Sequence, residues 1–185
     1  MHTLRYKINN DAIFFQMIRN YLSTYAYSSA STENFKEIVE TTTGEDFTVF
    51  FNQWIYGEGY PIFDIKWDQQ GDTLFVESVQ TTSTTTTPLF KTHFDLKLNY
   101  STGGDTIVRL YQDANTENFR ICVSNTVKSI QFDPNIWLIN KNSVSYVGID
   151  EYLGNNSLLF NAYPNPAHDK ITIVVEEENL QNLVT

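Results

Sequence analysis

The strongest constraint on the fold is a change of hydrophobic period near residue 59. Upstream, apolar residues recur every three or four positions, which is the spacing of amphipathic helices. Downstream, they recur every two positions, which is the spacing of half-buried strands. The change falls within Phe50–Pro61. Two structural units of different class therefore meet there, and we predict an α+β fold.

Residues 1–58 are expected to be helical. Residues 2–8 are read as the tail of one helix, and three short helices follow. The helix-end signals are N-caps at Asn10 or Asp11, at Thr32 and at Asp46, and a terminating glycine at Gly44. The buried stripes are expected to be Ile13, Phe14, Met17, Ile18, Tyr21, Leu22 and Tyr25; then Phe35, Ile38 and Val39; then Phe47, Phe50, Phe51, Trp54 and Ile55. Because short helices need a surface to pack on, we expect these stripes to be only partly covered.

Residues 59–141 are expected to form a β-sandwich of about seven strands. Its clearest alternation places Phe90, Thr92, Phe94, Leu96, Leu98 and Tyr100 on an apolar face, and Lys91, His93, Asp95, Lys97 and Asn99 on a polar face. The expected strands lie at about 63–67, 74–79, 90–100, 106–111, 118–123, 127–132 and 136–139. Residues 101–105 suit a hairpin loop.

Three further segments have a loop-like or truncated character. The threonine-rich stretch Thr81–Thr87 is predicted to be an exposed loop, either plainly solvated or glycosylated. Residues 142–159 are rich in Asn, Ser and Gly and are predicted to be a linker. Residues 160–185 hold one apolar strand, Ile171–Val175, and are predicted to be an incomplete β domain.

Charge and cysteine content narrow the classes of partner. The net charge is −10 and the pI about 4.6, so a nucleic-acid partner is not expected. No stretch is long and apolar enough to suggest a transmembrane segment, and no signal peptide opens the chain. Cys122 is the single cysteine, which excludes an intrachain disulfide. Its apolar neighbours favour a buried, inert thiol over a nucleophile.

The residues that could carry chemistry are few and scattered. His2, His93 and His168 are the only histidines, and no two are spaced to share a helix face. His93 and His168 are expected to be solvated rather than metal ligands. We assign no catalytic, cofactor-binding or metal-binding residue.

Two further groups allow a functional reading beside a structural one. Asp64, Asp68 and Asp72 would suit either a weak cation site or a solvated strand edge, and the calcium-loop spacing is missing. Trp54 and Tyr60 would suit either a ligand-stacking pair or packing between helix and sandwich. The structural reading is preferred for both, and Glu151 and Glu176–Glu178 are read as solvated charge.

An ordered series of motifs resembles the aminopeptidase N family of gluzincin zinc metallopeptidases. The matching stretches are His2–Ile8 with its Leu-Arg-Tyr, Phe14-Phe15, Tyr21-Leu22, Ser31–Phe35, Phe50-Phe51-x-x-Trp54, Gly59-Tyr60-Pro61 and Asp133–Leu138 with its Asp-Pro-x-x-Trp. The resemblance covers roughly residues 1–140. It implies that residues 1–58 are the last helices of a thermolysin-like catalytic domain and that residues 59–141 are the β-sandwich that follows it.

The same resemblance implies where the chemistry lies. The family's zinc ligands, its base, its transition-state tyrosine and its exopeptidase motif all fall upstream of position 1. None maps onto a residue here, so the chain alone is expected to be inactive, while zinc is expected in the intact parent.

The segment Tyr163-Pro164-Asn165-Pro166-Ala167, followed by Asp169–Ile173, has a second resemblance. It looks like the opening of the C-terminal sorting domain of the type IX secretion system in Bacteroidetes. This implies secretion or cell-surface display of the parent and contact with the type IX machinery.

Two functions therefore stay open. The first is the non-catalytic C-terminal portion of a secreted zinc aminopeptidase, whose partner is the missing catalytic domain and whose peptide substrates are reached through the parent. The second is a stand-alone β-sandwich module for binding or adhesion, without enzymatic activity.

Overall fold

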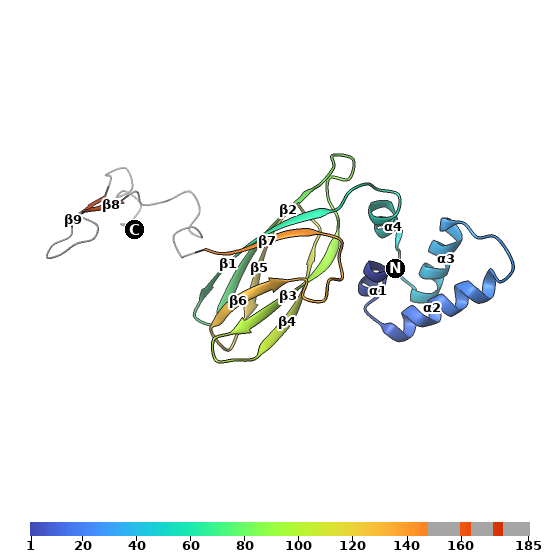
Figure 1. The fold of residues 1–185 in the computed structure, drawn as a ribbon, viewed down its shortest axis with the longest axis horizontal. Helices are drawn as coiled ribbons and strands as arrows, with labels where there is room; N and C mark the ends of the chain where they lie inside the picture. Colours follow the sequence, from blue (N-terminus) through green and yellow to red (C-terminus); the bar gives the residue numbers. More distant parts are fainter. Residues whose placement is uncertain (148–159, 164–171, 176–185) are drawn as a thin grey trace. The chain divides into compact units, whose positions relative to one another are not determined.

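Helices precede strands in the computed structural model, which describes residues 1–147, 160–163 and 172–175 (Figure 1). Residues 1–146 and 147–185 form two separate units. The helices are α1 (His2–Ile8), α2 (Asp11–Thr24), α3 (Thr32–Thr43) and α4 (Thr48–Trp54). The strands of the first unit are β1 (Pro61–Gln70), β2 (Thr73–Thr82), β3 (Thr92–Tyr100), β4 (Asp105–Gln112), β5 (Thr116–Cys122), β6 (Val127–Phe132) and β7 (Lys141–Tyr146).

The helix ends follow local hydrogen-bonding chemistry. Asn10 caps α2, since its side chain accepts a hydrogen bond from the Ile13 amide. Gly44 ends α3 in the left-handed conformation with a φ of 75°. The cap of α3 is Ser31, so the prediction of Thr32 is wrong by one residue. Ser31 is the N-cap because it forms a reciprocal capping box with Asn34.

The third predicted helix begins slightly later than expected. Asp46 accepts a hydrogen bond from the Thr48 amide at 2.7 Å, and α4 starts at Thr48 with Phe47 as its N-cap residue. Phe47 is buried together with apolar side chains from all four helices, and these form a second core of their own: Leu4, Phe14, Met17, Val39, Phe47, Phe50 and Phe51.

The apolar stripes of the helices are partly covered, as expected. Leu22 and Ile55 were predicted to be buried, yet 63% and 50% of these side chains are exposed. Phe15 and Val49 are also exposed. Four short helices bury one shared face and leave the flanks of each stripe in solvent.

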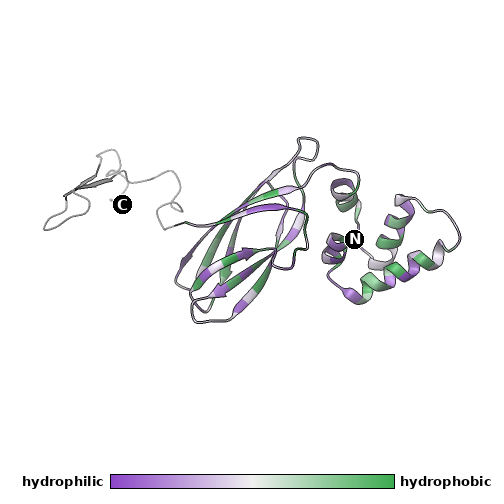
Figure 2. Ribbon diagram, viewed as in Figure 1, coloured by the Kyte–Doolittle hydropathy of each residue, from purple (hydrophilic) through white to green (hydrophobic). Residues whose placement is uncertain are grey.

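Seven strands of the first unit form two facing sheets, which confirms the predicted α+β class with a sandwich. One sheet has the order β5-β2-β1-β7 and the other has the order β4-β3-β6. All neighbours pair antiparallel except β1 and β7, which pair parallel. Figure 2 shows apolar and polar residues alternating along these strands, so each strand presents one side to the core.

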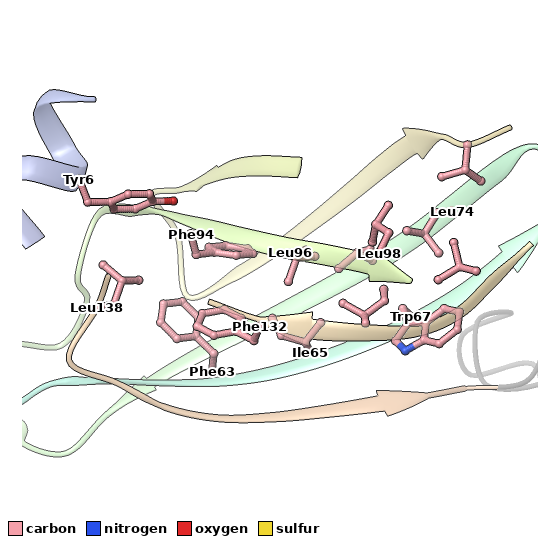
Figure 3. Packing of buried hydrophobic residues seen from close by; sticks show 14 residues of the cluster. Tyr6, Phe63, Ile65, Trp67, Leu74, Phe94, Leu96, Leu98, Phe132 and Leu138 are labelled. Atoms are coloured by element: carbon pink, nitrogen blue, oxygen red, sulfur yellow. The ribbon is translucent and has the colours of Figure 1, made fainter. Parts of the chain in front are cut away.

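The sandwich core lies between the inner faces of the two sheets. Phe63, Ile65 and Trp67 on β1 face Phe94, Leu96 and Leu98 on β3, and all are buried. Figure 3 shows Tyr6 of α1 at one end of this row of side chains and Trp67 at the other. The helical segment therefore supplies one side chain to the same cluster of buried residues.

The last strand of the sandwich is not where the sequence placed it. Residues 136–139 follow a turn and have irregular structure rather than a strand, with Ile136 at a φ of 55° and Ile136 and Ile139 both exposed. The seventh strand is β7, so the predicted linker 142–159 begins inside the sandwich. Residues 148–159, including Glu151, lie outside the described residues.

The threonine-rich stretch is only partly a loop. Thr81 and Thr82 end β2, and residues 83–87 form a bend. Thr87 is buried and accepts a hydrogen bond from the Glu58 amide at 3.0 Å, so it was wrongly predicted to be exposed. Glycosylation of the remaining threonines stays a prediction.

The second unit contains two short paired strands in its described part. These are β8 (Phe160–Tyr163) and β9 (Thr172–Val175), which pair antiparallel. The strand predicted at 171–175 thus corresponds to β9. Tyr163, the first residue of the Tyr-Pro-Asn-Pro motif, ends β8. The rest of the motif, His168 and Glu176–Glu178 lie outside the described residues.

Candidate functional site

The densest polar arrangement in the described residues lies where α1 meets the three-stranded sheet. The Tyr6 hydroxyl donates a hydrogen bond of 2.6 Å to Oδ1 of Asp95 on β3. Both residues are buried, at 5% and 7% exposed. A buried carboxylate that accepts a direct hydrogen bond is far less costly than an isolated one. This contact therefore ties α1 to the sandwich.

Arg109 on β4 holds Tyr6 from the other side. Its Nη2 donates to the Tyr6 carbonyl oxygen at 2.9 Å, and its Cζ lies 4.2 Å from the centroid of the Tyr6 ring. Arg109 is also the cross-strand partner of Asp95. Burial, followed by the hydrogen bond to Asp95, raises the pKa of Tyr6 well above its ordinary value. Tyr6 consequently remains a protonated donor at neutral pH.

Trp137 closes the same junction. Its ring stacks on His2 and Tyr6 with centroid separations of 4.4 and 5.6 Å. Its carbonyl oxygen accepts a hydrogen bond from the Thr3 hydroxyl at 3.1 Å. Asp133 fixes the turn that presents Trp137, since its carboxylate accepts from the Trp137 and Leu138 amides at 2.8 and 2.9 Å. The Asp-Pro-x-x-Trp motif thus has a structural explanation.

A hollow of about 430 Å³ lies between α1 and the sheet. Its lining is Arg5, Tyr6, Asn9, Asp11, Asp95, Ile107, Arg109 and Trp137. Arg5 is already paired with Asp11 at 2.7 Å. The hydroxyl of Tyr6 and the carboxylate of Asp95 in this hollow are bonded to each other, so these two groups hold α1 on the sheet.

A second contact region joins α4 to the sandwich. The Trp54 ring lies 4.8 Å from Phe90, which precedes β3. Gln53 binds the residues on either side of Phe90, donating to the Leu89 carbonyl at 2.8 Å and accepting from the Lys91 amide at 2.9 Å. Trp54 makes no ring contact with Tyr60 among the described residues; instead, Lys141 lies over the Tyr60 ring. Packing between helix and sandwich is therefore the better explanation of Trp54.

The two described histidines, His2 and His93, do not gather into a site. His2 stacks on Trp137, and His93 lies beside Tyr111 with ring centroids 4.8 Å apart. His93 was predicted to be solvated, yet it is half-buried and its Nδ1 has no hydrogen-bond partner. Burial, followed by the charges of Arg109 and Lys7, lowers the pKa of His93 to about 4.

The aspartates of β1 and its turn diverge. Asp68 is buried, so the prediction of a solvated strand edge is wrong for it, and its Oδ1 has no hydrogen-bond partner. Asp64 accepts a hydrogen bond from the Ser143 hydroxyl at 2.6 Å, and Asp72 is exposed. They do not converge on a common point in the way that a cation would require.

The fit of the described residues to a zinc ion can be tested directly. Zinc needs three or four His, Cys, Asp or Glu ligands around one point. No such group of three comes together within residues 1–147 or the two strands of the second unit. The described residues do not fit zinc, and no zinc chemistry is assigned to them. Likewise, none of the described helices has the length and hydropathy of a membrane span.

Cys122 is exposed, so the prediction of a buried thiol is wrong. It ends β5, an edge strand on which Phe119 and Ile121 turn inward and Cys122 turns outward. Strand alternation decides its environment, rather than the apolar character of its neighbours.

The sequence analysis did not find the Tyr6–Asp95–Arg109 arrangement. One signal was available: Asp95 stands in the middle of a strand whose other face is apolar except for Thr92. A buried partner for that carboxylate was not expected, because α1 is distant in the sequence.

Comparison with known proteins places the fold but not the family. No family model matches the chain, and no curated protein matches it. The fold is similar to that of Legionella pneumophila aminopeptidase A, solved in complex with aspartic acid, with a TM-score of 0.60 and 12% sequence identity. The likeness covers 79% of this chain and 17% of that one, so the chain spans a small part of the aminopeptidase it resembles.

Proposed function

We propose that this chain is the non-catalytic C-terminal portion of a zinc-dependent aminopeptidase. The observation that carries the proposal is the fold likeness, in which most of this chain corresponds to a minor share of an aminopeptidase. The order of the sequence motifs supports it independently. In this proposal, peptide-bond hydrolysis and zinc binding belong to the intact parent.

The proposed role of the chain is to support the catalytic domain. The α1 and α4 contacts hold the helices against the sandwich through Tyr6 and Gln53. The helices in turn expose Phe15, Leu22 and Val49, each more than 45% accessible. Exposed apolar side chains of this kind suit contact with a further domain. The sandwich would then buttress the helices that complete the catalytic domain.

Secretion by the type IX pathway is part of the same proposal. It rests on the Tyr-Pro-Asn-Pro sequence that begins at Tyr163, the last residue of β8. Export of the intact parent, compared in cells with and without that secretion system, would test it separately.

The main experiment uses the native protein. We expect mass spectrometry of the protein from its source cells to reveal peptides upstream of Met1, including a His-Glu-x-x-His sequence. The purified longer protein should hydrolyse an aminoacyl p-nitroanilide and lose this activity to a zinc chelator, whereas the 185-residue chain alone should not. A longer protein without zinc ligands, or cleavage by this chain alone, would refute the proposal.

A stand-alone binding module remains the second candidate, and one observation favours it. A hollow of about 490 Å³ lies at the far end of the sandwich, between Trp67, Lys128 and Tyr146. A carbohydrate and peptide array would test this role. Saturable binding that is lost in Tyr146→Ala, together with monomeric and cooperative thermal unfolding, would favour the module.

A further inference from the structure

A group of cationic side chains gathers on the outer face of the three-stranded sheet beside α1. Arg109 on β4 pairs in the sheet with Asp95 and lies two residues from Tyr111, the cross-strand partner of His93 on β3. Arg109 also contacts Tyr6, and Lys7 follows Tyr6 on α1. The Lys7 Nζ lies 5.9 Å from the centroid of the Phe47 ring. Lys7, His93 and Arg109, from α1, β3 and β4, thus lie near one another.

Lys7 and Arg109 lack carboxylate partners within the described part of the chain. The ion pairs there are Arg5–Asp11, Lys36–Glu40 and Lys97–Asp105. The nearby Asp95 carboxylate accepts from Tyr6 instead. The positive charges of Lys7 and Arg109 are therefore not neutralised by an ion pair within the described residues.

The same surface has apolar flanks. Tyr111 is 44% exposed and Ile107 is 46% exposed, and both point outward from β4 on the side that carries Arg109. The Tyr111 ring contacts His93. A surface of this mixed character suits a peptide, whose side chains offer both carboxylates and apolar groups.

We propose that this surface, formed by Lys7, His93, Ile107, Arg109 and Tyr111, docks a carboxylate-rich peptide segment of a protein partner. Arg109 has five N–H donors in a planar fork that matches a carboxylate, and its Nη2 already bonds the Tyr6 carbonyl. The inference does not depend on the proposed aminopeptidase origin.

The test uses the full chain and a short oligo-glutamate peptide as the probe. Carboxylates beside His93 favour its protonated form, so the peptide should raise the pKa of His93 above its value of about 4, measured by NMR of the ring. The other charged or titratable groups that face His93 are Tyr6 and Lys7 from α1, Lys91 and Asp95 from β3 and the residue before it, and Arg109, Tyr111 and Asp113 from β4 and the residue after it. His93→Gln assigns the resonance.

Matched variants locate the binding surface. Lys7→Gln should weaken binding by about threefold, as expected for loss of one exposed ion pair, while Lys7→Arg should retain the affinity. Lys128→Gln is the control, because β6 places Lys128 beside the opposite end of β3. Binding should weaken as the salt concentration rises.

Several outcomes would overturn the inference. Equal losses in Lys7→Gln and Lys128→Gln would place binding elsewhere, as would an unshifted His93 at saturating peptide. Equal binding of oligo-glutamine would make the interaction independent of carboxylates. Inorganic phosphate or duplex DNA that binds as tightly as oligo-glutamate would contradict the peptide specificity.

Discussion

The hydrogen bond between Tyr6 and Asp95 provides the sharpest test of how the helices are held on the sandwich. Tyr6→Phe keeps the ring that stacks on Trp137 and lies under Arg109, and removes only the hydroxyl. Asp95 is 7% exposed and would lose its 2.6 Å donor without gaining free access to water. Loss of a hydrogen bond to a buried charged acceptor costs about 1.5–3 kcal/mol.

The expected fall in the free energy of unfolding is therefore about 2 kcal/mol. For a protein of this size, about 1 kcal/mol corresponds to a Tm change of about 2–4 °C, so the Tm should fall by about 4–8 °C. Differential scanning calorimetry and urea titration measure the two quantities. Tyr21→Phe is the control, since Tyr21 is half-buried in α2 and its hydroxyl has no hydrogen bond among the described residues.

The pH dependence gives an independent readout of the same contact. The pKa of Tyr6 is raised in the folded state, while the unfolded chain has an ordinary tyrosine pKa of about 10. Above that pH the unfolded state releases a proton that the folded state retains, so stability should decline as the pH rises further. Tyr6→Phe should remove this contribution. A variant that matches Tyr21→Phe in both stability and alkaline response would refute the reasoning.

Three further perturbations test other parts of the structure. His93 has a folded pKa of about 4, below that of the unfolded chain, so its contribution to stability should be present above pH of about 6.5 and lost as the pH falls towards 4. Chemical denaturation of His93→Gln across this window should therefore show a flatter dependence of stability on pH. A pH dependence equal to that of the unsubstituted protein would contradict the lowered pKa of His93. Gly59 and Gly44 have φ of 81° and 75°, but a Cβ on Gly59 would also approach Ser83 and Thr84 at 2.6 Å, whereas Gly44 has open space. Gly59→Ala should therefore lower the Tm more than Gly44→Ala. Equal losses of Tm would show that the approach to Ser83 and Thr84 is unimportant. Trp54→Ala should lower the free energy of unfolding by about 3–5 kcal/mol, because it removes the ring that packs on Phe90. The control is Ile55→Ala at an exposed neighbouring position, which should cost well under 1 kcal/mol. Similar losses of stability in the two variants, measured by thermal unfolding, would argue against the packing of Trp54 on Phe90.

Short-range features were predictable because their causes lie within a few residues. The caps at Asn10 and Gly44 depend on local backbone geometry, and the alternation along 90–100 depends on strand pleating. The N-cap of α3 is Ser31 rather than the predicted Thr32 because Asn34, three residues after Ser31, completes the capping box.

Features that depend on distant partners were missed. β7 contains one partly buried apolar residue, Val144, and its pairing with β1 joins positions such as Ile62 and Lys141, so neither period nor composition marks it as a strand. Asp95 lies on the polar face of β3, and only the placement of α1 reveals that this face is covered. The candidate site was therefore the least predictable part of the structure, because its three main residues come from separate elements.

The parallel pairing of β7 has a consequence for anyone who shortens this chain. Ending the polypeptide at the Asp-Pro-x-x-Trp turn would delete Lys141–Tyr146 and leave the main-chain groups of Ile62–Trp67 without their neighbours. An exposed edge strand with unpaired main-chain groups tends to pair with strands of other molecules. A chain that ends at the turn is thus expected to oligomerise through β1, whereas a chain that ends after Tyr146 keeps β1 paired with β7.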